Sequence, residues 1–243
     1  MRSNPSFEQL AEKLFSAARH DRRVALAALS TAHMMLGMQE VVAGLYGRSL
    51  AYLGEGDRYR LEVLQSLWES FATAMPYLRG MVEPLVGFID HPSESELAGL
   101  AACFQVLADV DLEQCIKDVG GDLLGPVYTG LLSKHERDAG GKFYTPMPIS
   151  TLIAKMNQVS PGESVCDPCC GSGGMAVAVV LDLLERGLSR NSCSFTLADI
   201  DPMAVALAGV NMACRGVENV RLIVGDSLAP DWLETSPPLP RPS

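Results

Sequence analysis

The sequence predicts an α/β fold in which a helical N-terminal region is followed by a partial, doubly wound parallel sheet. Apolar residues recur with helical spacing through the first 135 or so residues, and after residue 146 helix patterns alternate with short strand patterns. A proline-rich stretch closes the chain. We therefore expect a helical region over residues 1–138, a sheet domain over 139–230 and a tail over 231–243.

The N-terminal region contains four apolar stripes with helical spacing. Ser93 and Glu96 form the sequence signature of a capping box and mark the start of one of these helices. The methionines at 34, 35 and 38 are expected to fill gaps in the core. The stripes are Phe7, Leu10, Ala11, Leu14, Phe15 and Ala18; Leu61, Leu64, Trp68, Phe71 and Met75; Leu97, Leu100, Phe104 and Leu107; and Leu123, Leu124, Val127 and Leu131.

The second region alternates helix and strand. Val165 and Cys166 are expected in a short buried strand that leads into a glycine-rich turn. Such alternation is typical of half a doubly wound sheet. The expected order is a helix with the apolar residues Ile149, Leu152, Ile153 and Met156, a strand near 164–167, a helix to about 187, a strand near 194–200, a helix from 202 and a strand near 220–225.

The glycine-rich turn is the most informative feature of the chain. It reads Asp-Pro-Cys-Cys-Gly-Ser-Gly-Gly from Asp167 to Gly174 and is followed by an apolar helix. A strand, a tight glycine turn and a helix N-terminus together bring the backbone close to a ligand. The spacing Gly171-x-Gly173-x-x-Ala176 also satisfies the loose dinucleotide-binding pattern, which by itself is a weak signal.

Acidic residues distinguish between the two kinds of ligand. Asp167 stands at the strand end where a pyrophosphate would approach, and its charge repels a dianion but attracts an ammonium group. Asp199 and Asp201 end the second predicted strand, where carboxylates can accept hydrogen bonds from ribose hydroxyls. This pattern favours S-adenosylmethionine over a nicotinamide cofactor. Cys166, Cys169 and Cys170 lack the paired fourth ligand of a zinc site, so we expect no metal.

Four motifs in this order resemble those of the N6-adenine DNA methyltransferases of the gamma arrangement, in particular the modification subunits of type I restriction systems and their short phage- or plasmid-borne relatives. The motifs are Gly-Lys-Phe-Tyr-Thr-Pro ending at Pro146, Asp-Pro-x-Cys-Gly-Ser-Gly-Gly at 167–174, Asp-Ile-Asp-Pro at 199–202 and Gly-Asp-Ser-Leu at 225–228. The departure at Cys169, where small residues such as alanine are usual, is mild.

The resemblance implies a Rossmann-like methyltransferase fold, of which this chain would hold a truncated part, and it implies roles for individual residues. The segment around Thr145 would close over the methionine end of S-adenosylmethionine, the glycine turn would hold it, Asp199 would take the ribose, and Asp226 would bind the adenine edge. The implied cofactor-binding residues are Phe143, Tyr144, Thr145, Pro146, Asp167, Cys170, Gly171, Ser172, Gly173, Gly174, Asp199, Asp201 and Asp226.

The catalytic signature of that family, Asn/Asp-Pro-Pro-Tyr/Phe after a fourth strand, does not occur in the sequence. The amine of adenine is a poor nucleophile, so the enzyme must accept its hydrogens and stack the flipped base on an aromatic ring. The weak candidates are Ser236, Pro237 and Pro238, but Leu239 offers no aromatic face and no strand-like run precedes them. A proline-rich tail is the better interpretation.

Composition bounds the remaining questions. A chain of 243 residues that is 48% hydrophobic, with no apolar run of transmembrane length and seven cysteines in apolar stretches, is typical of a cytoplasmic protein with reduced thiols. The net charge of −10 argues against a wide basic DNA-binding face. Local basic groups remain candidates, such as Lys134, His135, Arg137 and Lys142, although each also fits a solvated helix end.

Two hypotheses about function follow. The first is a DNA adenine N6-methyltransferase homologue that uses S-adenosylmethionine and acts on DNA with the help of another subunit. The second is a non-catalytic cofactor-binding or interaction subunit, or a truncated gene product, that needs a partner for methyl transfer. A sheet that stops after its third strand leaves the first strand as a bare edge, which a partner chain, a second copy, the N-terminal helices or the tail could cover.

Overall fold

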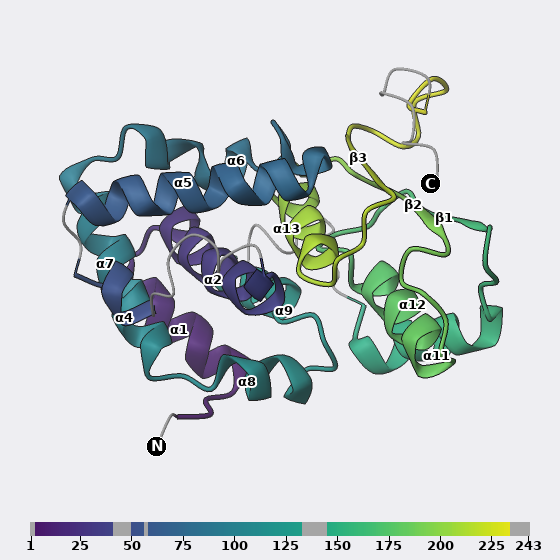
Figure 1. The fold of residues 1–243 in the computed structure, drawn as a ribbon, viewed down its shortest axis with the longest axis horizontal. Coiled ribbons are helices and arrows are strands. Elements are labelled where there is room, and N and C mark those ends of the chain that lie inside the picture. The colour runs from purple at the N-terminus through teal and green to yellow at the C-terminus, as the bar shows by residue number, and fades with distance from the viewer. Residues whose placement is uncertain (1–2, 41–49, 56–57, 133–144, 234–243) are drawn as a thin grey trace.

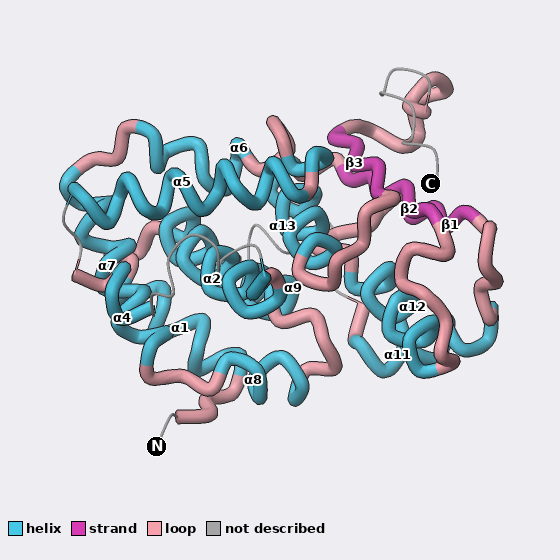
Figure 2. Tube along the Cα trace, in the orientation of Figure 1, coloured by secondary structure: helices cyan, strands magenta, loops and turns pink. Residues whose placement is uncertain are grey.

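A computed structural model describes residues 3–40, 50–55, 58–132 and 145–233 (Figure 1). The N-terminal helices gather on one side of the molecule, and a short parallel sheet with its own helices lies on the other (Figures 1 and 2). The helical side comprises α1 (Phe7–Ala17), α2 (Arg22–Gly37), α4 (Leu50–Leu53), α5 (Arg58–Ala74), α6 (Glu83–Val86), α7 (Glu94–Ala108), α8 (Leu112–Asp118), α9 (Leu124–Leu131) and the 3-10 turns η1 (Pro76–Leu78) and η2 (Gly87–Asp90).

The second side begins with α11 (Met147–Asn157), so its elements follow the order that the sequence predicts. It continues with β1 (Ser164–Asp167), α12 (Gly174–Glu185), β2 (Ser194–Asp199), α13 (Pro202–Ala213) and β3 (Val220–Val224). The α/β fold class is thus confirmed. The expected boundary between residues 138 and 139 lies outside the described residues.

Side-chain caps fix where several helices begin. The capping box predicted at α7 is present: the Ser93 backbone N–H donates to Glu96 Oε2 at 2.8 Å, and the Glu96 N–H donates to Ser93 Oγ at 3.3 Å. A second box joins Ser6 and Gln9 at the start of α1. Each box satisfies backbone donors that a helix N-terminus would otherwise leave without partners.

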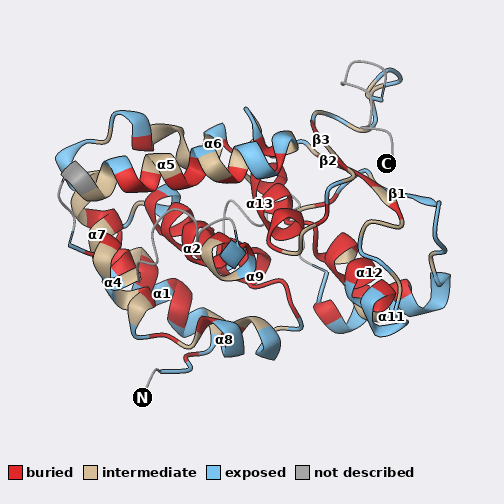
Figure 3. Ribbon diagram, viewed as in Figure 1, coloured by how far each residue is buried: buried red, intermediate tan, exposed pale blue. Residues whose placement is uncertain are grey.

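The predicted apolar stripes form the core of the helical side. Leu10, Leu64, Phe104 and Val127, one from each stripe, are all buried. Helix α2 runs through the centre and is buried on nearly every side, as the red ribbon in Figure 3 shows. The methionines behave as expected: those at 34 and 38 are buried, and the one at 35 packs against the core.

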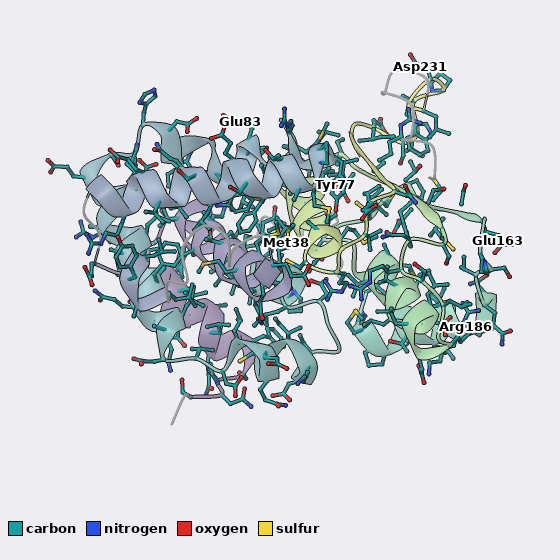
Figure 4. The ribbon with its side chains drawn as sticks, in the orientation of Figure 1. Met38, Tyr77, Glu83, Glu163, Arg186 and Asp231 are labelled. Atoms are coloured by element: carbon teal, nitrogen blue, oxygen red, sulfur yellow. The ribbon has the colours of Figure 1, made fainter. Side chains whose placement is uncertain are left out.

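The helical side packs directly on α13. Leu207 and Val210 of this helix belong to the same buried cluster as the helical region. Tyr77, which lies between the two sides in Figure 4, donates a hydrogen bond from its hydroxyl to the Val217 carbonyl at 2.9 Å. The N-terminal helices are therefore placed on the α13 and β3 side of the sheet.

The three strands are parallel and lie in the order β1-β2-β3, so β1 is an edge. The expected bare edge is observed within the described ranges, and the N-terminal helices do not cover it. The expectation that Val165 and Cys166 are buried is wrong, because Val165 is half-buried and Cys166 is exposed. Among described residues β1 pairs only with β2, which leaves its outer side in solvent.

Helix α11 forms as predicted, but the expected apolar face points outward. Ile149, Leu152, Ile153 and Met156 are 48%, 55%, 37% and 75% exposed. The helix packs on α12 through a different face, which contains Met147, Ser150 and Ala154. The four apolar residues have no covering element in the described part of the chain, so the spacing predicted the helix but not the surroundings of this face.

Buried His33 in α2 couples stability to pH. Its side chain is 4% exposed, and Nδ1 has no hydrogen-bond partner among the described residues. Burial, and secondarily the positive charge of Arg215, lower the pKa of His33 to about 3. The folded state therefore holds His33 neutral at pH values where the unfolded chain already binds a proton.

We predict that the protein loses stability as the pH falls below about 6.5, the pKa of histidine in an unfolded chain. Since the folded pKa is depressed, the loss from His33 reaches about 1.4 kcal/mol at pH 5.5 relative to pH 8. Denaturant unfolding of wild type and His33→Gln at both pH values measures this contribution. The exposed His91→Gln is the control, and an equal acid loss in His33→Gln and wild type contradicts the prediction.

Candidate cofactor-binding site

A cavity of about 450 Å³ lies where the carboxyl ends of β1 and β2 meet the glycine-rich turn. Helix α9 of the helical side forms its opposite wall. This position, at the carboxyl edge of a parallel sheet, is where open α/β sheets bind ligands. A larger hollow, of about 1010 Å³, lies between α1, the start of α7 and the end of α9, but none of the four methyltransferase-like motifs contributes to it.

Two glycines give the turn its shape. Gly171 and Gly173 have φ values of 53° and 83°, a region that favours glycine. A Cβ atom on Gly173 would also lie 3.2 Å from the Cβ of Ala208, so the turn sits tightly against α13. Gly173 then leads into α12, whose N-terminus has no side-chain cap and borders the cavity at Gly174 and Met175.

The carboxylate of Asp199 holds the turn from the sheet side. Its Oδ2 accepts a hydrogen bond from the Gly171 N–H at 2.9 Å, and its Oδ1 accepts one from the Asp201 N–H at 2.9 Å. A carboxylate has about four acceptor positions, so these two bonds leave capacity for a ligand. Asp199 is therefore both a support for the turn and a candidate ligand-binding group.

Asp201 has structural partners. Its Oδ1 accepts the Met203 N–H at 3.0 Å and caps α13, while its Oδ2 accepts the Tyr128 hydroxyl at 2.5 Å. Asp226 also lines the cavity, and its Oδ1 accepts the Leu228 N–H at 2.9 Å. The two predicted site acids thus differ, because Asp201 joins α9 to α13 whereas Asp226 belongs to the loop after β3.

The cavity carries a concentrated negative charge. Asp167, Asp199, Asp201 and Asp226 line it, and no lysine, arginine or histidine stands among the described lining residues. Burial raises the pKa of Asp167, and the charge of Asp199 raises it further, against an opposing hydrogen bond from the Cys169 N–H. A cation bound here would offset the repulsion between these carboxylates, whereas an anion would add to it.

The remaining predicted residues divide into two groups. Thr145, Cys170, Ser172 and Gly174 line the cavity, and Pro146, which is exposed, caps α11. Other predicted residues lie outside the described part of the chain: Phe143 and Tyr144 of the closing segment, the weak catalytic candidates Ser236, Pro237 and Pro238, and the basic group Lys134, His135, Arg137 and Lys142.

Several lining residues were not anticipated. Helix α9 contributes Gly125, Tyr128 and Thr129, and α11 contributes Ser150, whose buried hydroxyl has no partner among the described residues. The α9 sequence has the apolar spacing of an ordinary core helix, so only its polar residues Tyr128 and Thr129 hinted at another role. Their contribution depends on how the helical side packs against the sheet, which local sequence does not encode.

Other features of the described chain constrain its chemistry. All seven cysteines are free, and Cys166 and Cys169 are exposed. Within the described ranges, no group of three His, Cys, Asp or Glu side chains is arranged to hold a metal ion. No described helix combines the length and apolar character that crossing a membrane requires.

Sequence and structure similarities agree with the site. Residues 119–239 match the N-6 DNA methylase family. The chain is 39% identical over 106 residues to the type I restriction enzyme MjaIX methylase subunit of Methanocaldococcus jannaschii, covering 44% of this chain and 19% of that protein. It is 34% identical over 100 residues to the HindI methylase subunit of Haemophilus influenzae, covering 40% and 22%. These matches span about a fifth of each relative's length.

The fold is also similar to that of a solved methyltransferase subunit. The type I restriction-modification system methyltransferase subunit from Streptococcus thermophilus superposes with a TM-score of 0.53 at 17% identity, over 94% of this chain and 60% of that one. This likeness concerns the fold alone. Together with the family match over residues 119–239 and the glycine turn that it contains, the similarity to methylase subunits shows that this chain belongs to the N-6 DNA methylase family.

Proposed function

We propose that the cavity binds S-adenosylmethionine and that the chain is the cofactor-binding part of a DNA adenine N6-methyltransferase in a restriction-modification system. The observation that carries this proposal is a glycine turn beside a cavity lined by four aspartates and by no described basic residue. The similarity to type I methylase subunits supports the reaction and the DNA substrate.

The described residues fit this cofactor. Asp167 suits the ammonium group of its amino-acid end, and the uncapped N-terminus of α12 suits the carboxylate beside it. Asp199 has acceptor capacity for the ribose hydroxyls, and Asp226, which lines the same cavity, would bind the adenine edge. The volume of about 450 Å³ falls in the range of roughly 300–1,000 Å³ that small-molecule sites occupy. The bound cofactor would supply an electrophilic methyl group.

A nicotinamide dinucleotide fits this site poorly. Its pyrophosphate would approach the turn beside Asp167 and Asp199, where burial, and in addition the charge of Asp199, already raise the pKa of Asp167. No described lining residue carries a positive side chain to compensate. Electrostatics therefore favours a ligand with a cationic end over a dianionic one.

We predict that Asp199→Ala weakens S-adenosylmethionine binding by about tenfold or more, because a charge-assisted hydrogen bond contributes roughly 1.5 to 3 kcal/mol. Calorimetry on wild type, Asp199→Ala and the exposed, remote Asp90→Ala measures the effect. Only Asp199→Ala should lose affinity, and NAD should bind none of the three. Wild type without affinity, or Asp199→Ala with unchanged affinity, contradicts the proposal.

Methyl transfer requires groups that the described chain does not provide. The target amine needs an acceptor for its hydrogens and an aromatic face for the flipped base. The candidates Ser236, Pro237 and Pro238 include neither an amide or carboxylate acceptor nor an aromatic ring. We infer that elements outside the described residues supply these groups and take part in recognising DNA.

The isolated chain is therefore expected to bind the cofactor but to methylate DNA slowly or not at all, because stabilisation of the transition state is incomplete. The assay uses labelled S-adenosylmethionine and DNA of the host, with and without the products of neighbouring genes, and detects N6-methyladenine. Robust methylation by the chain alone, abolished by Ser236→Ala, would refute this and identify the tail as an active-site loop.

A second candidate function, a non-catalytic interaction subunit, is favoured by the exposed face of α11. Four apolar side chains on this helix lie at 37% to 75% exposure. The free edge of β1 belongs to the same side of the molecule, on which α11 and α12 pack together (Figure 1). An apolar surface beside an unpaired strand edge is typical of a protein interface. This surface is therefore the candidate partner-binding surface.

We expect this surface to cause self-association when no partner covers it. Wild type should form larger species as its concentration rises, and the double variant Leu152→Glu, Met156→Glu should remain monomeric because charges oppose burial. Light scattering after size-exclusion chromatography measures the mass. Leu233→Glu, at an exposed leucine beyond β3, is the control, and a wild type that stays monomeric at all concentrations contradicts the expectation.

A further inference from the structure

A buried carboxylate links the helical side to the cofactor turn. Asp122 lies between α8 and α9 and is 0% exposed. A charge in such a position is costly unless it is paired and hydrogen-bonded. The hydrogen-bond partners of Asp122 therefore indicate its role in the structure.

Three hydrogen bonds from described residues reach the Asp122 carboxylate. Its Oδ1 accepts the Gly125 N–H at 3.0 Å, at the start of α9, and the Asn211 side-chain amide at 2.8 Å. Its Oδ2 accepts the Ser172 hydroxyl at 2.6 Å, and Ser172 is the central residue between the two positive-φ glycines of the turn. One carboxylate thus joins α9, α13 and the glycine-rich turn.

Neighbouring groups complete the same network. The Asn211 amide also donates to the Ser172 carbonyl at 2.9 Å, so both the backbone and the side chain of Ser172 are held. Arg215, which is partly buried just after the end of α13, donates to the Asn211 carbonyl at 2.6 Å and to the Gly121 carbonyl at 2.5 Å. Its positive charge lies next to Asp122 and offsets the burial of the carboxylate.

Capping alone does not account for this arrangement. Asp111 caps α8 in the same way, through a bond from the Gln114 N–H to its Oδ1 at 3.1 Å, and it is only half-buried. Asp122 makes the equivalent bond to Gly125 and adds two bonds that cross to α13 and the turn. The bonds to Asn211 and Ser172 place the Asp122 carboxylate between the two halves of the chain, where it is fully buried.

We propose that Asp122 is a positioning residue that holds the cofactor turn through Ser172, so that the helical side is an integral part of the cofactor site. Asp199 fixes the turn from the sheet side through Gly171, and Asp122 fixes it from the helical side. The turn is clamped between two carboxylates that belong to different halves of the chain. This inference rests on the proposed function only where cofactor affinity is concerned.

The test combines hydrogen exchange of the cofactor-free protein with calorimetry of S-adenosylmethionine binding. Asp122→Ala should raise amide exchange in residues 170–174 at least tenfold, leave β2 protected, and weaken cofactor binding about tenfold at a temperature where the variant is folded. Asp122→Asn should restore most of both properties. Its amide oxygen can accept from Gly125 and Asn211, and its NH2 group can donate to a reoriented Ser172 hydroxyl.

Four further variants separate positioning from stability. Ser172→Ala should reproduce the effect of Asp122→Ala on the turn. The double variant should be no worse than Asp122→Ala, because both changes break the same hydrogen bond between Ser172 and Asp122. Asp111→Ala should lower stability without changing exchange in the turn or affinity. Ser30→Ala, at a buried serine without a partner among the described residues, should change neither property.

Other results overturn the proposal. Amide hydrogen exchange in the glycine-rich turn that stays at the wild-type level in Asp122→Ala or Ser172→Ala would contradict it. An Asp111→Ala variant that raises this exchange to the same extent would also contradict it. If Asp122→Ala does not fold, Ser172→Ala carries the same test. A wild type with no cofactor affinity refutes the proposed function, whereas exchange in the cofactor-free protein still decides the role of Asp122.

Discussion

Helix α13 is shared by the two hydrophobic cores, and the arrangement of the rest of the molecule depends on this sharing. Leu207 and Val210 belong to the core of the helical side, while Val205, Ala208 and Met212 belong to the core of the sheet side. A helix that is apolar all round can be stable only when it is covered all round. Burial of this one helix is therefore a main contact between the two halves of the chain.

The cofactor site is assembled around the same helix. Ala208 lets the turn approach closely at Gly173, Asp201 caps α13 while it binds Tyr128, and Asn211 joins Asp122 to Ser172. Each of these contacts links α13 to a segment from elsewhere in the chain. The geometry of the cavity is consequently a property of both halves, although its motifs lie in only one of them.

The sheet side is less complete than the helical side. The helical core is closed, whereas β1 has one described neighbour and α11 exposes four apolar side chains. A cavity at the carboxyl edge of the sheet next to an uncovered strand edge and helix face fits the proposal of a chain that binds cofactor and acts within a larger assembly. The aspartates of the cavity and the apolar side chains of α11 lie on different surfaces, so the two properties can be separated by mutation.

Local sequence determined much of this protein. Helical stripes, the capping box at Ser93 and the strand-turn-helix at Asp167 depend on neighbours within a few residues, and all of them appear where they were predicted. The acids at Asp199 and Asp226 reach the cavity because the ends of parallel strands share one edge of the sheet.

Tertiary packing decided the rest. Periodicity shows that one face of α11 is apolar but not whether anything covers it, and the structure leaves Leu152 and Met156 exposed. The exposure of Cys166 follows from the position of β1 at an edge, which depends on strand order and not on local pattern. The roles of Asp122 and Tyr128 arise only when the helical side packs on α13, because their partners are 50 and 73 residues away in the sequence.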